Sequence, residues 1–120
     1  MTEQTLPSVY LYRAVVVNVY DGDTMRADID LGFNMWVKNM QLRLAGIDTP
    51  ELRGDERPEG LVARDFVRER LPVGNEIYVM TEKDKSGKYG RYIATIFYGS
   101  ELTNLNEELI AEELARIVHY

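Results

Sequence analysis

Acidic residues and a proline follow an apolar segment in the stretch AGIDTPE, residues 45–51. Asp48 and Glu51 stand three residues apart, a spacing of carboxylates that core packing does not explain. Thr49 precedes a proline, which favours extended backbone and fixes the direction of the Thr49 carbonyl beside the Asp48 carboxylate. Carboxylate and carbonyl oxygens are both ligands of hard cations such as calcium. The stretch predicts part of a metal site, with Glu51 holding a water; the simpler interpretation is an acidic, solvated loop.

Two earlier residues suit the same chemistry. In DGDT, residues 21–24, Asp21 is the better turn former and Asp23 remains free to point at a ligand, although Asp-Gly alone is a common turn signal. Arg43 alternates with two leucines in QLRLAGI, so it points to the opposite side of the strand that leads to Asp48. A lone arginine on a strand is more commonly an exposed, solubilising residue.

A third stretch is GKYGRY, residues 87–92. Its two glycines permit a tight turn that contains Lys88 and Tyr89, and Arg91 begins the strand that follows. A polar hairpin turn without any catalytic role would have the same composition.

Taken together, these residues are the parts that hydrolysis of a phosphodiester with one hard metal requires. Two carboxylates and a carbonyl hold the cation, which polarises a phosphoryl oxygen and positions a water. A further carboxylate near that water acts as the base, and two guanidiniums stabilise the charge that grows in the transition state. The residues expected in these roles are Asp23, Asp48 and the Thr49 carbonyl for the metal, Glu51 for the water, and Arg43 and Arg91 for the phosphate.

Hydrophobic patterning predicts the elements that position these residues. Runs of β-branched and aromatic residues indicate five strands, at residues 9–20, 25–31, 35–47, 75–82 and 91–98. A helix is expected from Pro58 until just before Pro72, and a second helix after Asn104, which forms a variant capping box with Glu107. The order βββ-α-ββ-α fits a closed or partly closed five-stranded OB-fold barrel with two helices, an α+β fold that is mainly β.

Length and composition narrow the function further. A chain of 120 residues predicts one domain, residues 1–120, and the absence of cysteine excludes disulfides and thiolate metal sites. The sequence has no signal peptide pattern and no apolar run of membrane-spanning length, so an intracellular protein without a membrane partner is expected. The net charge of −6 argues against a histone-like nucleic-acid binder, but not against an enzyme that holds phosphate with local arginines and a metal.

In order and spacing, the blocks DGDT, LRLAGIDTPE and KYGR resemble the three signature blocks of the staphylococcal nuclease (thermonuclease) family. The resemblance runs over roughly residues 15–115 and includes LNEELIAEELA near the end of the chain. It implies an OB-fold enzyme that hydrolyses DNA and RNA with calcium, cutting the 5′ P–O bond to leave a 3′-phosphate. The implied roles are calcium ligands at Asp23, Asp48 and the Thr49 carbonyl, a general base or water-orienting group at Glu51, catalytic phosphate contacts at Arg43 and Arg91, and substrate contacts at Lys88 and Tyr89.

The sequence also departs from the family pattern. Gly87 stands where many members carry an acid, and Glu113 replaces a glycine near the end of the second helix. The sequence ends at Tyr120, without the family's third, C-terminal helix, and the family's base-stacking tyrosine falls near His119 or Tyr120.

A single-stranded substrate is favoured, because its bases can reach aromatic side chains. Whether the chain is a monomer or a homodimer stays open.

Two alternatives belong to other functional classes. The first is a nuclease-like domain that is weakly active or inactive and serves to bind nucleic acid or protein. The second is an unrelated OB-type barrel that binds a small anion or a peptide. Retention of every acid and both arginines argues against the first alternative, and the match of three blocks in order argues against the second.

Overall fold

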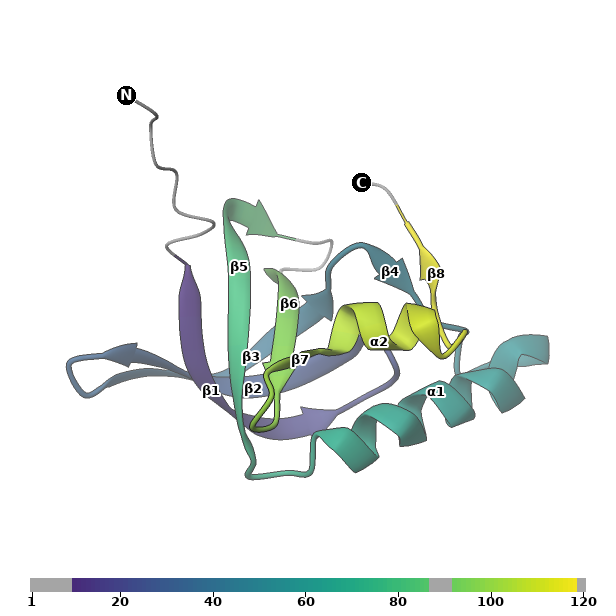
Figure 1. The fold of residues 1–120 in the computed structure, drawn as a ribbon, viewed down its shortest axis with the longest axis horizontal. Helices are drawn as coiled ribbons and strands as arrows, with labels where there is room; N and C mark the ends of the chain where they lie inside the picture. The colour runs from purple at the N-terminus through teal and green to yellow at the C-terminus, as the bar shows by residue number, and fades with distance from the viewer. Residues whose placement is uncertain (1–9, 87–91, 119–120) are drawn as a thin grey trace.

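The computed structural model describes residues 10–86 and 92–118, and Figure 1 shows how the elements are arranged. The longer strands are β1 (Leu11–Val19), β2 (Thr24–Gly32), β3 (Met35–Leu44), β5 (Glu76–Ser86) and β6 (Tyr92–Tyr98). The two-residue strands are β4 (Ile47–Asp48), β7 (Thr103–Asn104) and β8 (Arg116–Ile117). The helices are α1 (Arg57–Arg70), preceded by a 3₁₀ turn at Gly54–Glu56, and α2 (Leu105–Ala111).

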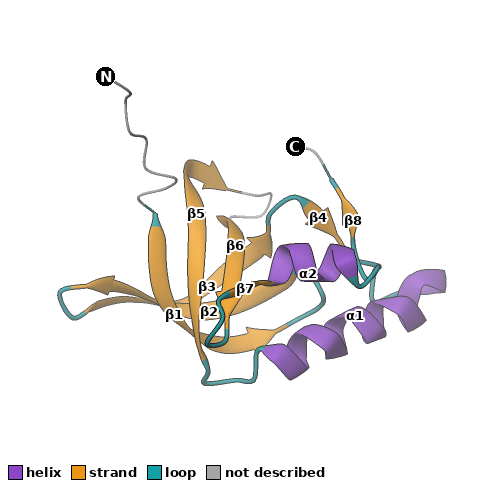
Figure 2. Ribbon diagram, viewed as in Figure 1, coloured by secondary structure: helices purple, strands orange, loops and turns teal. Residues whose placement is uncertain are grey.

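The five longer strands form a closed barrel. β1 pairs antiparallel with both β2 and β5, β2 pairs with β3, and β5 pairs with β6. The barrel closes through a parallel pairing in which residues 42–44 of β3 lie opposite residues 92–94 of β6. This topology confirms the predicted five-stranded OB-fold barrel with two helices, and Figure 2 shows more strand than helix.

Side chains that alternate along the strands fill the barrel, and one face of each helix closes it. Val67 of α1, Leu71 directly after α1, and Leu105 and Leu109 of α2 join the buried cluster. The strands contribute Ala14, Val16, Val19, Met25, Ala27, Ile29, Leu42, Leu44, Ile77, Val79, Ala94 and Ile96. Neither described helix has the length and apolar character needed to cross a membrane.

The predicted strand at residues 35–47 is interrupted, which corrects the sequence interpretation. β3 ends at Leu44, where the amide of Ala45 makes a last bond of 2.7 Å to the carbonyl of Ala94. Gly46 then adopts a positive φ of 73°, a conformation that glycine allows without steric cost, and the chain turns away from the barrel. The apolar pattern continues through this turn, so periodicity alone does not reveal it. As a result, Asp48 lies on the separate strand β4.

Asparagines at the start of α2 connect this helix to the barrel. Asn104 accepts a hydrogen bond of 3.0 Å from the amide of Glu107, which confirms the predicted cap. Buried Asn106 accepts from the Ile96 amide at 3.1 Å and donates to the carbonyls of Ala45 at 2.9 Å and Ala94 at 3.1 Å. Asn106 therefore anchors α2 to the turn that leads to Asp48.

Candidate active site

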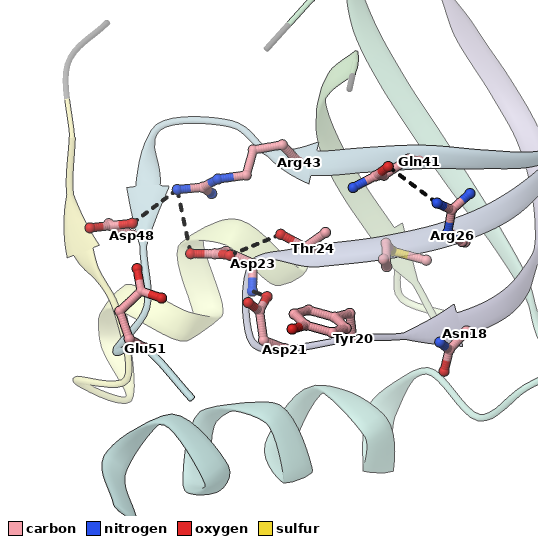
Figure 3. A pocket seen from close by; sticks show the side chains of 11 residues that line it. Asn18, Tyr20, Asp21, Asp23, Thr24, Arg26, Gln41, Arg43, Asp48 and Glu51 are labelled. Carbon is pink, nitrogen blue, oxygen red and sulfur yellow. Dashed lines mark hydrogen bonds and ion pairs between the residues drawn. The ribbon is translucent and has the colours of Figure 1, made fainter. Parts of the chain in front are cut away.

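A polar cavity of about 560 Å³ opens at the end of the barrel, where the β1–β2 turn, the end of β3 and the segment after β4 meet. Four of the residues predicted from the sequence line it: Asp23, Arg43, Asp48 and Glu51. Figure 3 shows these side chains directed into a common space from three separate segments of the chain. The structure therefore brings together carboxylates and a guanidinium that are up to 28 residues apart in sequence.

The Asp23 carboxylate is fixed by the backbone around it. Asp23 is buried, with its side chain only 10% exposed, and the carboxylate accepts hydrogen bonds from the Thr49 amide at 2.9 Å and from the Thr24 hydroxyl at 3.2 Å. Asp21 accepts from the Asp23 amide at 3.0 Å, so Asp21 forms the turn as predicted and leaves the Asp23 side chain directed inward. The bond to Thr49 connects the first carboxylate of the site directly to the segment that carries the second.

Arg43 lies between the two aspartates. Its Nη2 is 3.0 Å from Asp48 Oδ1 and 3.4 Å from Asp23 Oδ2, and its Nη1 donates to the Leu44 carbonyl at 3.0 Å. The Arg43 side chain is 13% exposed, so these contacts are largely shielded from solvent. A lysine ammonium group at this position would not reproduce the geometry of the guanidinium. The positive charge of Arg43 thus occupies the position between two carboxylates that a cation would also favour.

Arg116 is a site residue that the sequence interpretation missed. Its Nη2 lies 3.3 Å from Asp48 Oδ2, because β4 and β8 pair with Asp48 opposite Arg116. The two oxygens of Asp48 are therefore held by two different arginines. The Arg116 side chain is 80% exposed, and an exposed ion pair of this kind adds little to the stability of the fold. No local signal identifies Arg116, since the contact joins residues 68 positions apart.

Asp21 adds a further carboxylate to the wall of the cavity. Burial, followed by the nearby negative charge of Asp23, raises the pKa of Asp21 to about 7. Desolvation and a like charge nearby both disfavour the ionised carboxyl. The sequence interpretation assigned Asp21 to the turn alone.

The site offers few protein ligands to a metal, which suits a hard cation that also binds water. Among the described residues no group of three or more acids or histidines is arranged to hold a metal, and the two carboxylates that approach each other most closely at Arg43 are those of Asp23 and Asp48. Thr49 is buried, and its hydroxyl has no hydrogen-bond partner in the described structure. Thr49 lines a neighbouring pocket and is not among the residues that line this cavity, so the predicted metal ligands that face the cavity are the carboxylates of Asp23 and Asp48. Carboxylates suit calcium, which accepts oxygen ligands and completes its shell with water.

Glu51 stands apart from the ion pairs. Its side chain is exposed and points toward the same space as the Asp23 and Asp48 carboxylates (Figure 3). Within the part of the chain that the structure describes, its carboxylate makes no hydrogen bond or ion pair. The Glu51 carboxylate therefore faces the cavity without a competing partner among the described residues.

The remaining three predicted residues, Lys88, Tyr89 and Arg91, lie outside the described residues. Their predicted roles stay predictions.

Gly60 on α1 sets the position of the Glu51 segment. A Cβ at residue 60 would lie 2.9 Å from the carbonyl oxygen of Pro50 and closer still to that of Glu51. Gly60→Ala is therefore expected to displace this segment, lowering the free energy of unfolding by about 1–3 kcal/mol and reducing activity, although alanine favours a helix by about 1 kcal/mol. Thermal unfolding measures the first effect and a hydrolysis assay the second.

Val62→Ala on the exposed side of the same helix is the matched control, and it is expected to leave both properties unchanged. A Gly60→Ala protein that is more stable than the wild type and fully active would contradict the close contact with the Glu51 segment.

Comparisons with known proteins agree with this geometry. Residues 41–120 match the family model described as Staphylococcal nuclease homologue, a range that contains Arg43, Asp48 and Glu51 and begins after Asp23. The chain is 34% identical over 108 residues to the thermonuclease of Staphylococcus hyicus, covering 88% of this chain and 59% of that protein. It is 31% identical over 119 residues to the endonuclease Htp3 of Saprolegnia parasitica, covering 88% of this chain and 55% of that protein.

The match extends over most of this chain and somewhat more than half of the length of these relatives. The family model covers two thirds of the sequence, and the barrel topology is the one that the family resemblance implies. This chain belongs to the staphylococcal nuclease family.

Proposed function

We propose that this chain hydrolyses phosphodiester bonds in single-stranded DNA or RNA in a calcium-dependent reaction. The observation that carries the proposal is the Arg43 guanidinium held between Asp23 and Asp48, 3.4 and 3.0 Å from their oxygens, in a cavity that Glu51 also lines. The names of the relatives, thermonuclease and endonuclease, support the same class of reaction.

Asp23, Asp48 and the Thr49 carbonyl are the residues that would hold calcium. Bound there, calcium would supply a Lewis acid that polarises a phosphoryl oxygen of the substrate. The hydrogen bonds to Asp23 from Thr49 and Thr24 keep its carboxylate in place without the metal, so the protein does not rearrange at this residue to form the site.

Arg43 would contact the phosphate and stabilise charge in the transition state. Its planar guanidinium presents two parallel donors that match two phosphoryl oxygens, which an ammonium group does not reproduce. A cation between the aspartates would compete with Arg43 for the same oxygens and free its donors for the substrate. Arg91 is proposed as the second guanidinium, with Lys88 and Tyr89 as substrate contacts.

Glu51 would accept the proton of the attacking water. Its exposed carboxylate faces the cavity and is not committed to a partner among the described residues. Attack in this arrangement is proposed to break the 5′ P–O bond and leave a 3′-phosphate on the product.

Degradation of single-stranded DNA, RNA and plasmid DNA in calcium and in excess chelator tests the proposal. We expect hydrolysis in calcium and almost none in chelator, with single strands cut faster than duplex. Binding of the same substrates without cleavage in calcium would instead favour a binding module, and it would refute the proposed enzyme.

A further inference from the structure

Strands β2 and β3 continue past the barrel as a two-stranded ribbon, which projects from the body of the molecule in Figure 1. Residues 24–32 of β2 pair with residues 35–43 of β3 along this ribbon. Phe33 and Asn34 form the turn with φ values of 56° and 64°, and the Phe33 side chain is 97% exposed. The ribbon therefore extends the two strands that carry Thr24 and Arg43 away from the cavity.

The outer face of this ribbon is continuous with the cavity. Arg43 lies opposite Thr24, and Gln41 lies opposite Arg26, whose Nη2 donates to Gln41 Oε1 at 3.3 Å. All four residues line the cavity, and Figure 3 shows Arg26 and Gln41 farther along the same two strands than Arg43. An extended ligand that enters the cavity can thus leave it along this face.

Trp36 lies farther along this outer face. Trp36 pairs with Asp30 of β2. The pairing of β2 and β3 shifts by one residue between Ala27 and Ile29. Because of this shift, Trp36 and Lys38 lie on the same outer face as Gln41, although each stands an odd number of positions from it in sequence. The Trp36 side chain is 41% exposed, and Lys38 Nζ stands 5.2 Å from the centre of its ring. An exposed indole beside an ammonium group is a surface on which a nucleobase stacks while its phosphate meets the cation.

The charges along the face suit a polyanion, but only weakly. Three cations follow one another from the cavity outward: Arg43, Arg26 and Lys38. Two acids lie on the same face, and both of them interact with other groups of the ribbon. Asp28 lies 3.6 Å from Lys38 Nζ and accepts from the Asn39 amide, while Asp30 accepts from the Gly32 amide at 2.8 Å. Stacking on Trp36, more than charge, is therefore the contact that this end of the face offers.

We propose that a single strand of nucleic acid bound at the candidate active site continues along the outer face of the β2–β3 ribbon and stacks a base on Trp36. This inference rests on the proposed function. Six or seven residues at about 3.3 Å each separate Arg43 from Trp36, a span of about 20 Å that a dinucleotide does not bridge. Strands 2 and 3 are also the face with which other OB folds bind oligonucleotides.

Trp36 is the only tryptophan of the chain, so its fluorescence reports on this contact directly. In chelator, where no cleavage is expected, an oligothymidylate of about twelve nucleotides should quench the fluorescence, and a dinucleotide should not. Trp36→Ala should weaken binding of the longer strand about tenfold. The dependence of that binding on salt should stay unchanged, because no phosphate contact is lost.

Phe33→Ala at the tip of the ribbon is the matched control, since it removes an exposed aromatic ring without touching the outer face at Trp36. In calcium, Trp36→Ala should raise KM for the longer strand about tenfold with kcat unchanged, and should leave cleavage of a dinucleotide unaffected. Phe33→Ala should change neither constant. Circular dichroism confirms that both variants are folded.

The outcomes separate this inference from the proposed function. A wild-type protein that cleaves the longer strand, shows no fluorescence response and has the same KM as Trp36→Ala would overturn the Trp36 contact alone. Equal losses in Trp36→Ala and Phe33→Ala would also overturn it, because the effect would then belong to the ribbon as a whole. A wild-type protein that cleaves neither substrate in calcium would refute the proposed function.

Discussion

Asp23→Asn is expected to lower kcat/KM on single-stranded DNA by about a thousandfold, or about 4 kcal/mol of transition-state stabilisation, while the protein remains folded. Asparagine keeps one oxygen that accepts from the Thr49 amide, and its amide nitrogen can donate to the Thr24 hydroxyl oxygen, so we expect the local structure to persist. The substitution removes one of the two negative charges proposed to hold calcium. Steady-state kinetics and circular dichroism measure the two parts of this expectation.

Asp28→Asn is the matched control for Asp23→Asn. It removes a carboxylate from β2, the strand that follows Asp23, but Asp28 does not line the cavity and pairs instead with Lys38 at 3.6 Å. We expect this control to keep nearly full activity. An Asp23→Asn protein within tenfold of the wild type would show that Asp23 does not hold the metal.

Arg43→Lys is expected to lower kcat by a hundredfold or more, on the order of 3 kcal/mol, with the net charge unchanged. Arg43 contacts Asp23, Asp48 and the Leu44 carbonyl through two nitrogens, and one ammonium group does not reproduce that geometry. Lysine also lacks the planar guanidinium, so the proposed contact with two phosphoryl oxygens is lost. Kinetics at saturating substrate, with calcium affinity measured separately, distinguish a loss of chemistry from a loss of metal.

The control for Arg43→Lys is Arg64→Lys on α1, where the guanidinium pairs with Asp65 on the same helix at 2.9 Å. Because that pair is local and away from the cavity, we expect normal kinetics from this variant. Near-normal kcat in a folded Arg43→Lys protein would contradict the role proposed for the guanidinium.

The barrel was predictable from the sequence because its strands carry strong local signals. Alternating apolar residues in β2 and the long β-branched run of β1 specify strands whose inner faces must be buried. The break between β3 and β4 was not predictable, since Ala45 and Gly46 continue the apolar pattern and the turn depends on a bond to Ala94.

The candidate site was predictable in part. Asp23, Arg43, Asp48 and Glu51 were named from residue type and spacing, and the structure places all four around one cavity. Their chemical roles remain predictions.

Other features of the site depend on tertiary contacts that leave no local pattern. Arg116 reaches Asp48 only because β8 pairs with β4, and Asn106 reaches Ala45 only because α2 packs against the barrel. The raised pKa of Asp21 likewise results from burial and from its distance to Asp23, neither of which spacing reveals.

Calcium-dependent hydrolysis at this site is tested most directly by measuring calcium binding by titration calorimetry and the calcium dependence of hydrolysis on the same preparation. We expect one bound calcium per chain, a half-activating concentration equal to the dissociation constant, and loss of both in Asp23→Asn. Full hydrolysis in excess chelator, or calcium binding that Asp23→Asn leaves unchanged, would contradict it.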